Sequence, residues 1–424
     1  MTVASTRRRI AVSAGTAAVS AAVALAASAC SASGLDHGAP VLAAPAGGTS
    51  LLATMQGVVW SFQPGRSPSV VRGWDRGQRW QVVLTNQGAG ADLAAGYFLG
   101  PGEAWAVTQQ PGAAGRGPVR TILATTNGGR HWFRGGPLPG AGRLPGYVGH
   151  DEIYFADAKH GWLLSAGTSP GDGGRQRLML WSTADGGHVW TPVPSRGLPL
   201  QAARLDWTGT SQGDCPDRPV MTFANPLDGW LTLGPCGARR TAPRVWRTAD
   251  GGRRWTAVAL PAPEGGWSAW YGTGRPPGLH FPGSVRMTGV TVGPVRIAAS
   301  GISAIALVSV ALGRSKLVIF RSGDGGRTWR IVARLHTGTR PARTSPACWF
   351  DPISATDWVV NASGLLIETT DGGRHWHYIR SRSHLPGAVA SFIKLNDGYE
   401  QGPGFTIRRT KDSGRYWMSE PVPQ

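Results

Sequence analysis

Short apolar runs alternate with polar, glycine-rich turns along the chain beyond residue 50. Seven of these runs are followed by an acidic or amide residue, glycine and then tryptophan, and in six of the seven a Ser or Thr stands two residues before the acidic or amide residue. Apolar runs of this length between turn residues predict β-strands. The clearest runs are Ile122-Leu123, Leu178-Met179-Leu180, Val318-Ile319-Phe320 and Leu365-Leu366-Ile367. The pattern therefore predicts an all-β chain.

The turn between predicted strands is a repeated motif. Seven segments align without gaps, each with Gly two residues after an Asp or Asn and Trp five residues after it. Asp and Asn fold back onto backbone N–H groups, glycine supplies positive φ, and the tryptophan buries a large ring. The acidic or amide positions are Asp75, Asn127, Asp185, Asp250, Asp324, Asp371 and Asp412. The tryptophans are Trp80, Trp132, Trp190, Trp255, Trp329, Trp376 and Trp417.

A second, aromatic-led run lies one predicted strand upstream of most motifs, at Trp105, Trp162, Trp230 and Trp358 and more weakly at Tyr399. The motif resembles the Asp-box, or BNR repeat, and its pairing with an upstream aromatic strand is similar to photosystem assembly-factor-like and sialidase-superfamily propellers. The resemblance implies one seven-bladed β-propeller of four-stranded antiparallel blades over residues 51–424, with structural boxes. The first copy, with Gly73 and Arg76, is the most degenerate.

Composition agrees with this fold. The 62 glycines, 32 prolines and 19 tryptophans, with only 16% charged residues, exclude a disordered chain and a helical bundle. The apolar run from Ile297 to Leu312 is too short for a membrane span and predicts buried strands.

Residues 1–29 resemble an export signal of the lipoprotein type. Arg7, Arg8 and Arg9 precede an apolar stretch and small residues, and Cys30 then resembles the lipidated cysteine of a lipobox, although Ala27 stands where leucine is usual. A plain secretion signal and an uncleaved anchor are the alternatives, and twin-arginine export remains open beside the general route. Residues 30–50 predict a flexible tether. Each alternative places the folded part outside the cytoplasm, at the outer face of the bacterial cytoplasmic membrane or secreted.

Cys215 and Cys236 flank a predicted hairpin with strands at 219–224 and 229–234. They fall opposite each other at its open end, and export permits a disulfide, so we expect them to be bridged. Cys348 is expected to be a buried thiol at the start of a strand. The Cys/His spacing does not match a zinc site, and neither a metal nor a cofactor is expected.

Strand order places the box turns on one face of the propeller and the long variable loops on the other. Ligand sites usually occupy such loops. Residues 196–217 and 261–286 are the largest loops, and aromatic, acidic and arginine side chains there suit a sugar or anionic ligand. The alternative is that the aromatics cap blades and fill the channel. The candidate ligand residues are Trp207, Arg239, Arg240, Glu264, Trp267, Trp270 and Tyr271.

The formal charge of +19 comes mostly from arginine. It predicts either general surface solvation or attraction to anionic lipid or cell-wall polymer, and export makes a nucleic-acid partner unlikely. In sialidase-like enzymes the first of three carboxylate-binding arginines normally lies in an Arg-Ile-Pro triplet before the first box. The nearest likeness here, Arg143-Leu144-Pro145, lies in the predicted loop between blades two and three. The sequence thus favours a monomeric binding or assembly scaffold for a protein or glycan, with no catalytic residue assigned. A glycoside hydrolase working through the loop face is the alternative.

Overall fold

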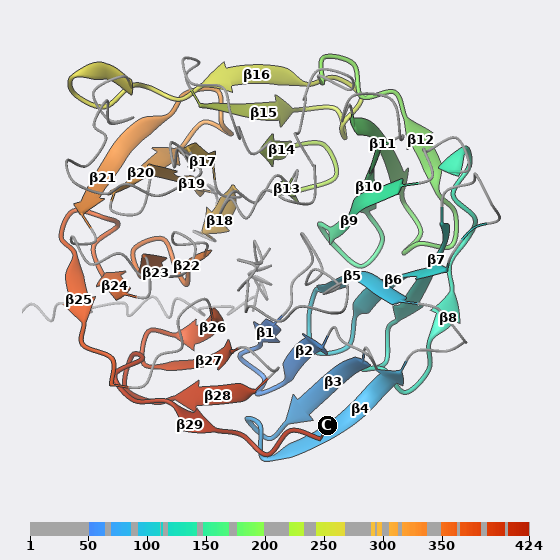
Figure 1. Ribbon diagram of the computed structural model, residues 1–424, viewed down its shortest axis with the longest axis horizontal. Helices are drawn as coiled ribbons and strands as arrows, with labels where there is room; N and C mark the ends of the chain where they lie inside the picture. The colour runs from blue at the N-terminus through green and yellow to red at the C-terminus, as the bar shows by residue number, and fades with distance from the viewer. Residues whose placement is uncertain are drawn as a thin grey trace, which may run out of the picture.

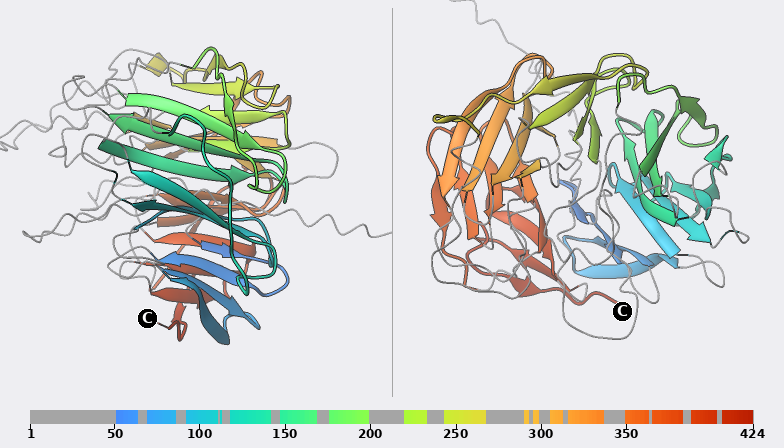
Figure 2. Two further views of the ribbon diagram at one scale, coloured as in Figure 1. Left: turned by 90° about the vertical axis from the view of Figure 1, so that its right-hand side faces the viewer. Right: turned by 45° about the horizontal axis from the view of Figure 1, so that its top comes forward.

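The structure is a computed structural model. It describes residues 51–423 except 64–68, 86–91, 111, 113–117, 142–146, 169–175, 199–219, 233–242, 268–289, 293–294, 299–304, 313–315, 337–348, 363–364, 383–387 and 403–405. Its sheets are arranged in a ring, with the first strand of each sheet nearest the centre and the last at the rim (Figure 1). In the edge-on view of Figure 2, the strands run across the thickness of the ring. The prediction of an all-β propeller is confirmed.

Six sheets have four antiparallel strands in chain order. They are β1 (Leu51–Ala53), β2 (Val59–Gln63), β3 (Ser69–Trp74) and β4 (Arg79–Thr85); β5 (Asp92–Phe98), β6 (Ala104–Gln110), β7 (Val119–Thr125) and β8 (Phe133–Arg134); β9 (Tyr147–Phe155), β10 (Gly161–Thr168), β11 (Gln176–Thr183) and β12 (Thr191–Val193); β13 (Val220–Phe223), β14 (Gly229–Thr232), β15 (Arg244–Thr248) and β16 (Thr256–Ala259); β22 (Trp349–Pro352), β23 (Trp358–Ala362), β24 (Leu365–Thr369) and β25 (His377–Ile379); and β26 (Val389–Lys394), β27 (Asp397–Gln401), β28 (Ile407–Thr410) and β29 (Met418–Ser419).

The remaining sheet has five strands, so the prediction of four strands in every blade is wrong here. They are β17 (Val290–Val292), β18 (Arg296–Ala298), β19 (Ile305–Leu312), β20 (Lys316–Ser322) and β21 (Arg330–His336). Both β17 and β18 pair with β19, at its two ends, so they share the innermost position. Gly293 and Pro294 lie between them in the sequence, and proline has no N–H to donate to a strand ladder.

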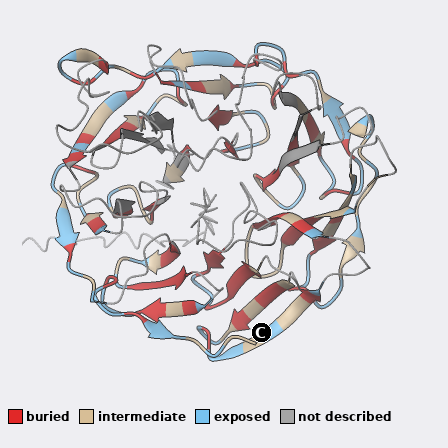
Figure 3. Ribbon diagram, viewed as in Figure 1, coloured by how far each residue is buried: buried red, intermediate tan, exposed pale blue. Residues whose placement is uncertain are grey.

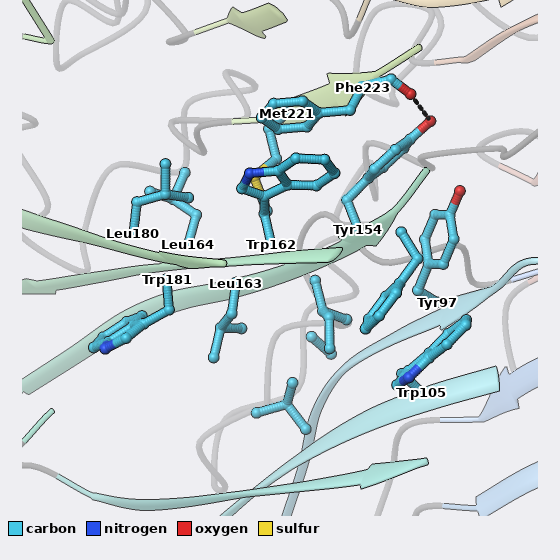
Figure 4. Close-up of a cluster of buried hydrophobic side chains, with 14 of the residues drawn as sticks. Tyr97, Trp105, Tyr154, Trp162, Leu163, Leu164, Leu180, Trp181, Met221 and Phe223 are labelled. Atoms are coloured by element: carbon cyan, nitrogen blue, oxygen red, sulfur yellow. Dashed lines mark hydrogen bonds between the residues drawn. The ribbon is translucent and has the colours of Figure 1, made fainter. Parts of the chain in front are cut away.

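The inner strands are buried on both faces because every blade is packed between two others. Figure 3 shows buried residues on the inner and middle strands and exposed ones on the rim strands. In β10, Trp162, Leu163 and Leu164 are all nearly inaccessible. Successive side chains point to opposite faces of a strand. Figure 4 accordingly shows Trp162 and Leu164 on one side and Leu163 on the other.

Aromatic stacking joins neighbouring blades. The Trp105 ring lies over Phe155 with centroids 3.6 Å apart, and the Trp162 ring lies over Phe223 at 3.5 Å. Each tryptophan leads the second strand of one blade, and each phenylalanine ends the first strand of the next. Trp105 and Trp162 therefore form contacts between blades, whereas the ring contacts of Trp358 are with Phe350 and Trp376 of its own blade.

The box motifs form turns between the third and fourth strands of their sheets, and we call them box turns. In six of them the Ser or Thr hydroxyl accepts a hydrogen bond from the N–H of the residue four positions later, and it donates to the acidic or amide side chain. That side chain also accepts from the N–H two residues beyond the second glycine. The anchoring hydroxyls belong to Thr125, Thr183, Thr248, Ser322, Thr369 and Thr410.

The first copy is built differently, as its sequence predicts. Gly73 has no hydroxyl to anchor the turn, and Asp75 and Arg76 adopt positive φ values of 53° and 56°. Trp80 nevertheless donates its indole N–H to the Gly77 carbonyl at 2.7 Å. The first copy therefore keeps a hydrogen bond from its tryptophan to the turn, although it lacks the hydroxyl that holds the other six turns.

Box turns and first hairpin turns share one face, which confirms the predicted arrangement. The first box glycine donates its N–H to a carbonyl in the first turn of the same blade, as from Gly186 to Lys159 and from Gly251 to Leu227, both at 2.9 Å. The loop after β16 leaves from the opposite ends of these strands, because Leu260 donates its N–H to the Pro243 carbonyl just before β15 at 2.8 Å. The segment after β12 instead passes the next box turn, where Arg196 donates its N–H to the Arg253 carbonyl at 2.9 Å.

Side chains of the first and last sheets meet and close the ring. Leu51, Val59 and Val71 pack in one cluster with Tyr399 and Ile407. The backbone N–H of Ala53 also donates to the Ser391 hydroxyl at 3.1 Å. Closure therefore uses side-chain packing between two sheets that are each continuous in sequence.

Part of the apolar run from Ile297 to Leu312 lies in β18 and β19, so the prediction of strands there is confirmed for that part. In the portion of the chain that is described, no helix has the length and apolar character needed to cross a membrane.

The second glycine of a box turn should be irreplaceable, and Gly326 offers the sharpest test. Its φ is +81°, and a Cβ there would lie 2.1 Å from Trp230 Nε1 of the preceding blade. We expect Gly326→Ala to lower the free energy of unfolding in urea by about 2 kcal/mol or more. Gly323→Ala is the matched control, because nothing lies within 4 Å of its Cβ position. An equal effect of both substitutions would contradict this packing.

Candidate functional site

Two of the seven predicted ligand residues fall in the described part of the loop face. Glu264 is exposed in a turn after β16. Trp267 is 9% exposed, and its ring lies 6.1 Å from that of Phe320 within a cluster that also holds Trp230 and Val318. This placement supports the capping interpretation for Trp267. The others, Trp207, Arg239, Arg240, Trp270 and Tyr271, lie outside the described residues, as do Cys30, Cys215, Cys236 and Cys348.

The carboxylates of the box turns are committed to turn structure. The side-chain and backbone donors of Thr328 hold the pKa of Asp324 far below its usual range. The backbone N–H of His375 has the same effect on the pKa of Asp371. A general acid needs a raised pKa. These groups therefore remain ionised acceptors, in agreement with the predicted structural role of the boxes.

Polar side chains on the innermost strands connect one blade to the next. Glu152 in β9 accepts the backbone N–H of Met221 in β13 at 2.9 Å and 3.0 Å from its two oxygens. Asp351 in β22 accepts the N–H of Phe392 in β26 at 2.8 Å. Both carboxylates are almost fully buried. They satisfy backbone donors at the inner edge of the next sheet, where a buried unpaired N–H would be costly.

A buried ion pair joins the second and third sheets near the loop face. Arg120 in β7 donates its Nε–H to both oxygens of Asp151 in β9 at 2.7 Å. Gln109 and Ser165 also donate to this carboxylate. The Arg120 and Asp151 side chains are 1% and 0% exposed. Such full satisfaction of a buried charge is typical of a structural role.

Tyr399, one of the tyrosines that the structure describes, lies beside charged groups where the ring closes, and a sialidase-like mechanism would need a tyrosine next to such groups. Arg409 lies over its ring at 5.4 Å and forms a two-pronged ion pair with Asp397 at 3.0 Å and 3.1 Å. Burial raises the pKa of the Tyr399 hydroxyl, with Glu420 adding to the rise. A nucleophilic tyrosine needs activation, so this environment works against that chemistry.

No cluster of three or more potential metal ligands occurs among the residues that are described.

Sequence reasoning missed the buried charges that join the blades. The available signal was an acidic residue inside an apolar first strand, as in Asp151-Glu152-Ile153-Tyr154 and Phe350-Asp351. Charged residues are rarely buried without partners. Their position alone therefore indicated partners on a neighbouring blade.

The sheet topology defines the class of protein, a β-propeller of four-stranded antiparallel blades. No protein-family model and no curated protein matches the chain. Solved structures are similar in fold. One is YCF48 bound to D1 peptide, with 14% identity over 77% of this chain and 81% of that one and a TM-score of 0.42. Another is YCF48 from Cyanidioschyzon merolae, with 13% identity over 86% of this chain and 93% of that one and a TM-score of 0.45. A polysaccharide lyase of family PL25, an ulvan lyase, is a further example, with 12% identity over 88% of this chain and 95% of that one and a TM-score of 0.44. Similarity at this level concerns the fold alone.

The Asp151 cluster should contribute to stability well beyond what a surface ion pair does. Asp151→Ala leaves the Arg120 charge buried, and we expect the free energy of unfolding in urea to fall by about 3–5 kcal/mol. Arg79→Gln is the control, because its pair with Asp75 is largely exposed and should contribute about 0–1 kcal/mol. A loss as small as that of the control would show that the buried cluster does not hold the two sheets together.

Proposed function

We propose that the chain is an exported, lipid-anchored propeller that acts as a binding or assembly scaffold at the cell surface. In this proposal Cys30 carries the lipid, and a disulfide joins Cys215 to Cys236. The ring has seven blades in this proposal, with β17 and β18, which both pair with β19, sharing the innermost position of one blade. The partner is a protein or glycan bound by the loop face.

The strongest support for a scaffold is that the buried carboxylates bind donors of neighbouring blades and do not face a substrate. Glu152, Asp351 and Asp151 each bind a backbone or arginine donor of a neighbouring blade. Glycoside hydrolysis needs two carboxyl groups facing a substrate, one of them with a raised pKa. The buried acids on these inner strands are instead used to join blades.

The proposed ligand loops also fit the architecture. The loop after β16 leaves the face opposite the box turns, and the polar groups of the box turns are hydrogen-bonded within the turns themselves. Variable loops on a rigid ring can change ligand without disturbing the blades. The arginine-rich surface would add attraction to anionic lipid or cell-wall polymer.

The test is capture of a partner by the tagged, lipidated chain from its own membranes, compared between variants. We expect Trp207→Ala and Trp270→Ala to lose the captured partner without a change in melting temperature. Tyr416→Ala is the control, because this side chain is 55% exposed in a box turn on the other face. The scaffold proposal fails if the unmodified chain turns over a panel of fluorogenic glycosides or polysaccharides, which would favour the hydrolase alternative. It also fails if only the control loses the partner.

A further inference from the structure

The box turn between β20 and β21 borders a hollow with a volume of about 350 Å³. It lies on the face opposite the proposed ligand loops. The lining residues are Arg321, Gly323, Asp324, Thr328, Trp329 and Arg330. Two arginines therefore border this hollow, and its one acid belongs to the box turn.

The strand position just before the box hydroxyl, which Arg321 occupies here, is arginine in three other sheets. In the first sheet Arg72 donates to the Pro101 carbonyl at 2.9 Å and lies over the Trp60 ring.

The other two arginines are neutralised by acids. Arg247 pairs with Asp228 at 3.2 Å and donates to the Gly325 carbonyl at 2.5 Å. Arg409 pairs with Asp397 at 3.0 Å. Trp230 faces Arg247 across the strand pair, and Tyr399 faces Arg409. In each case the acid that pairs with the arginine lies two residues before the facing residue.

Arg321 lacks this acid. Arg321 faces Leu307, so the position that holds the acid in the sheets of Arg247 and Arg409 is here Ile305, an aliphatic residue. Like Arg247, Arg321 reaches the next blade, with Nη1 3.7 Å from the position of a Cβ on Gly372. Among the described residues, no ion pair neutralises Arg321.

A second arginine directly opposes Arg321 across the sheet. Arg330 in β21 is its cross-strand partner, whereas Thr256 faces Arg247 and Met418 faces Arg409. Like charges directly opposite each other destabilise a sheet. Burial lowers the pKa of Arg321, and the charges of Arg330 and of Arg374 in the next box turn lower it further.

Among the described residues, the acid that lines the hollow forms no ion pair with Arg321 or Arg330. Asp324 Oδ1 accepts the Ser322 hydroxyl and the Thr328 N–H, and Oδ2 accepts the Thr328 hydroxyl at 2.6 Å. Its acceptor positions are directed into the turn. The hollow thus combines converging arginines with an acid engaged elsewhere.

We propose that this hollow is a binding site for a tetrahedral oxyanion, the phosphate or sulfate group of a ligand, held by Arg321 and Arg330. Guanidinium groups bind such anions through paired, charge-assisted hydrogen bonds. The bound anion would remove the repulsion between the two strands. The site does not depend on the loop face, so it stands whether the chain is a scaffold or an enzyme.

The test is calorimetric titration of the full chain with sodium phosphate, with melting temperature as a second readout and sodium chloride of equal ionic strength as the reference. Phosphate stabilises many proteins unspecifically. A specific site instead gives a rise in melting temperature that follows saturable binding. We expect saturation for the unmodified chain and for Arg253→Gln, a control that removes an exposed box arginine elsewhere.

Two variants at the hollow should lose the site. Arg330→Glu places an opposite charge facing Arg321, so the melting temperature in chloride should rise and phosphate affinity should fall at least about tenfold. Arg321→Gln should lose affinity similarly without an added acid, which keeps the test valid if one variant folds poorly. The same phosphate response in the unmodified chain and in both variants would overturn the proposal.

The source of the anion is distinguished by a second titrant, glycerol phosphate, the headgroup fragment of an anionic phospholipid or polymer. Tighter binding of glycerol phosphate than of phosphate, lost in Arg321→Gln, supports a phosphate carried on a larger molecule. Equal or weaker binding supports the free anion. Saturable binding of either that is retained in both variants contradicts the assignment to this hollow.

Discussion

The packing of a box turn against the preceding blade is the interaction on which the rest of the ring depends. Its second glycine has positive φ and no side chain, so a residue of the blade before can lie directly on the turn. Val83, Trp105, Leu180, Trp230 and Leu366 occupy this place in five blades. Because the hydroxyl and acid of the motif hold the turn rigid, the contact has a fixed shape. The local turn motif thereby helps to fix the angle between neighbouring blades.

The other contacts between blades follow from that placement. The indole N–H of Trp105 reaches the Gly186 carbonyl in the next box turn at 2.8 Å, and Trp162 reaches Gly251 at 3.0 Å. Nearer the centre, carboxylates on the first strands satisfy the inner edge of the following sheet. Each blade is thus covered on two sides by its neighbours, as in other repeat architectures, where stability comes largely from interfaces. Ring closure repeats this packing between the first and last sheets.

Periodicity predicted the strands, the box turns and the face on which the turns lie, because all three depend on residues close together in the chain. The contacts between blades were not predictable in this way. Glu152 and Met221 are 69 positions apart, and their pairing depends on the rotation from one blade to the next. The candidate loop residues rested on composition alone, and Trp267 shows the weakness of that signal, because a buried core ring and a ligand platform have the same residue type. The hollow at Arg321 became visible only when equivalent strand positions could be compared.

If the box turns hold the blades together rather than acting as surface loops, their amide hydrogens should be protected from exchange, and amide hydrogen exchange measures this directly. The backbone N–H of the second glycine in a box turn donates to the buried Ser or Thr hydroxyl of the same turn. The donor–acceptor distances are 2.7–3.0 Å for Gly187, Gly252 and Gly326. Elements held this way should exchange only when the ring unfolds as a whole. We expect protection of these turn amides close to that of the inner strands. Exchange at the rate of an exposed loop, with the strands still protected, would contradict it.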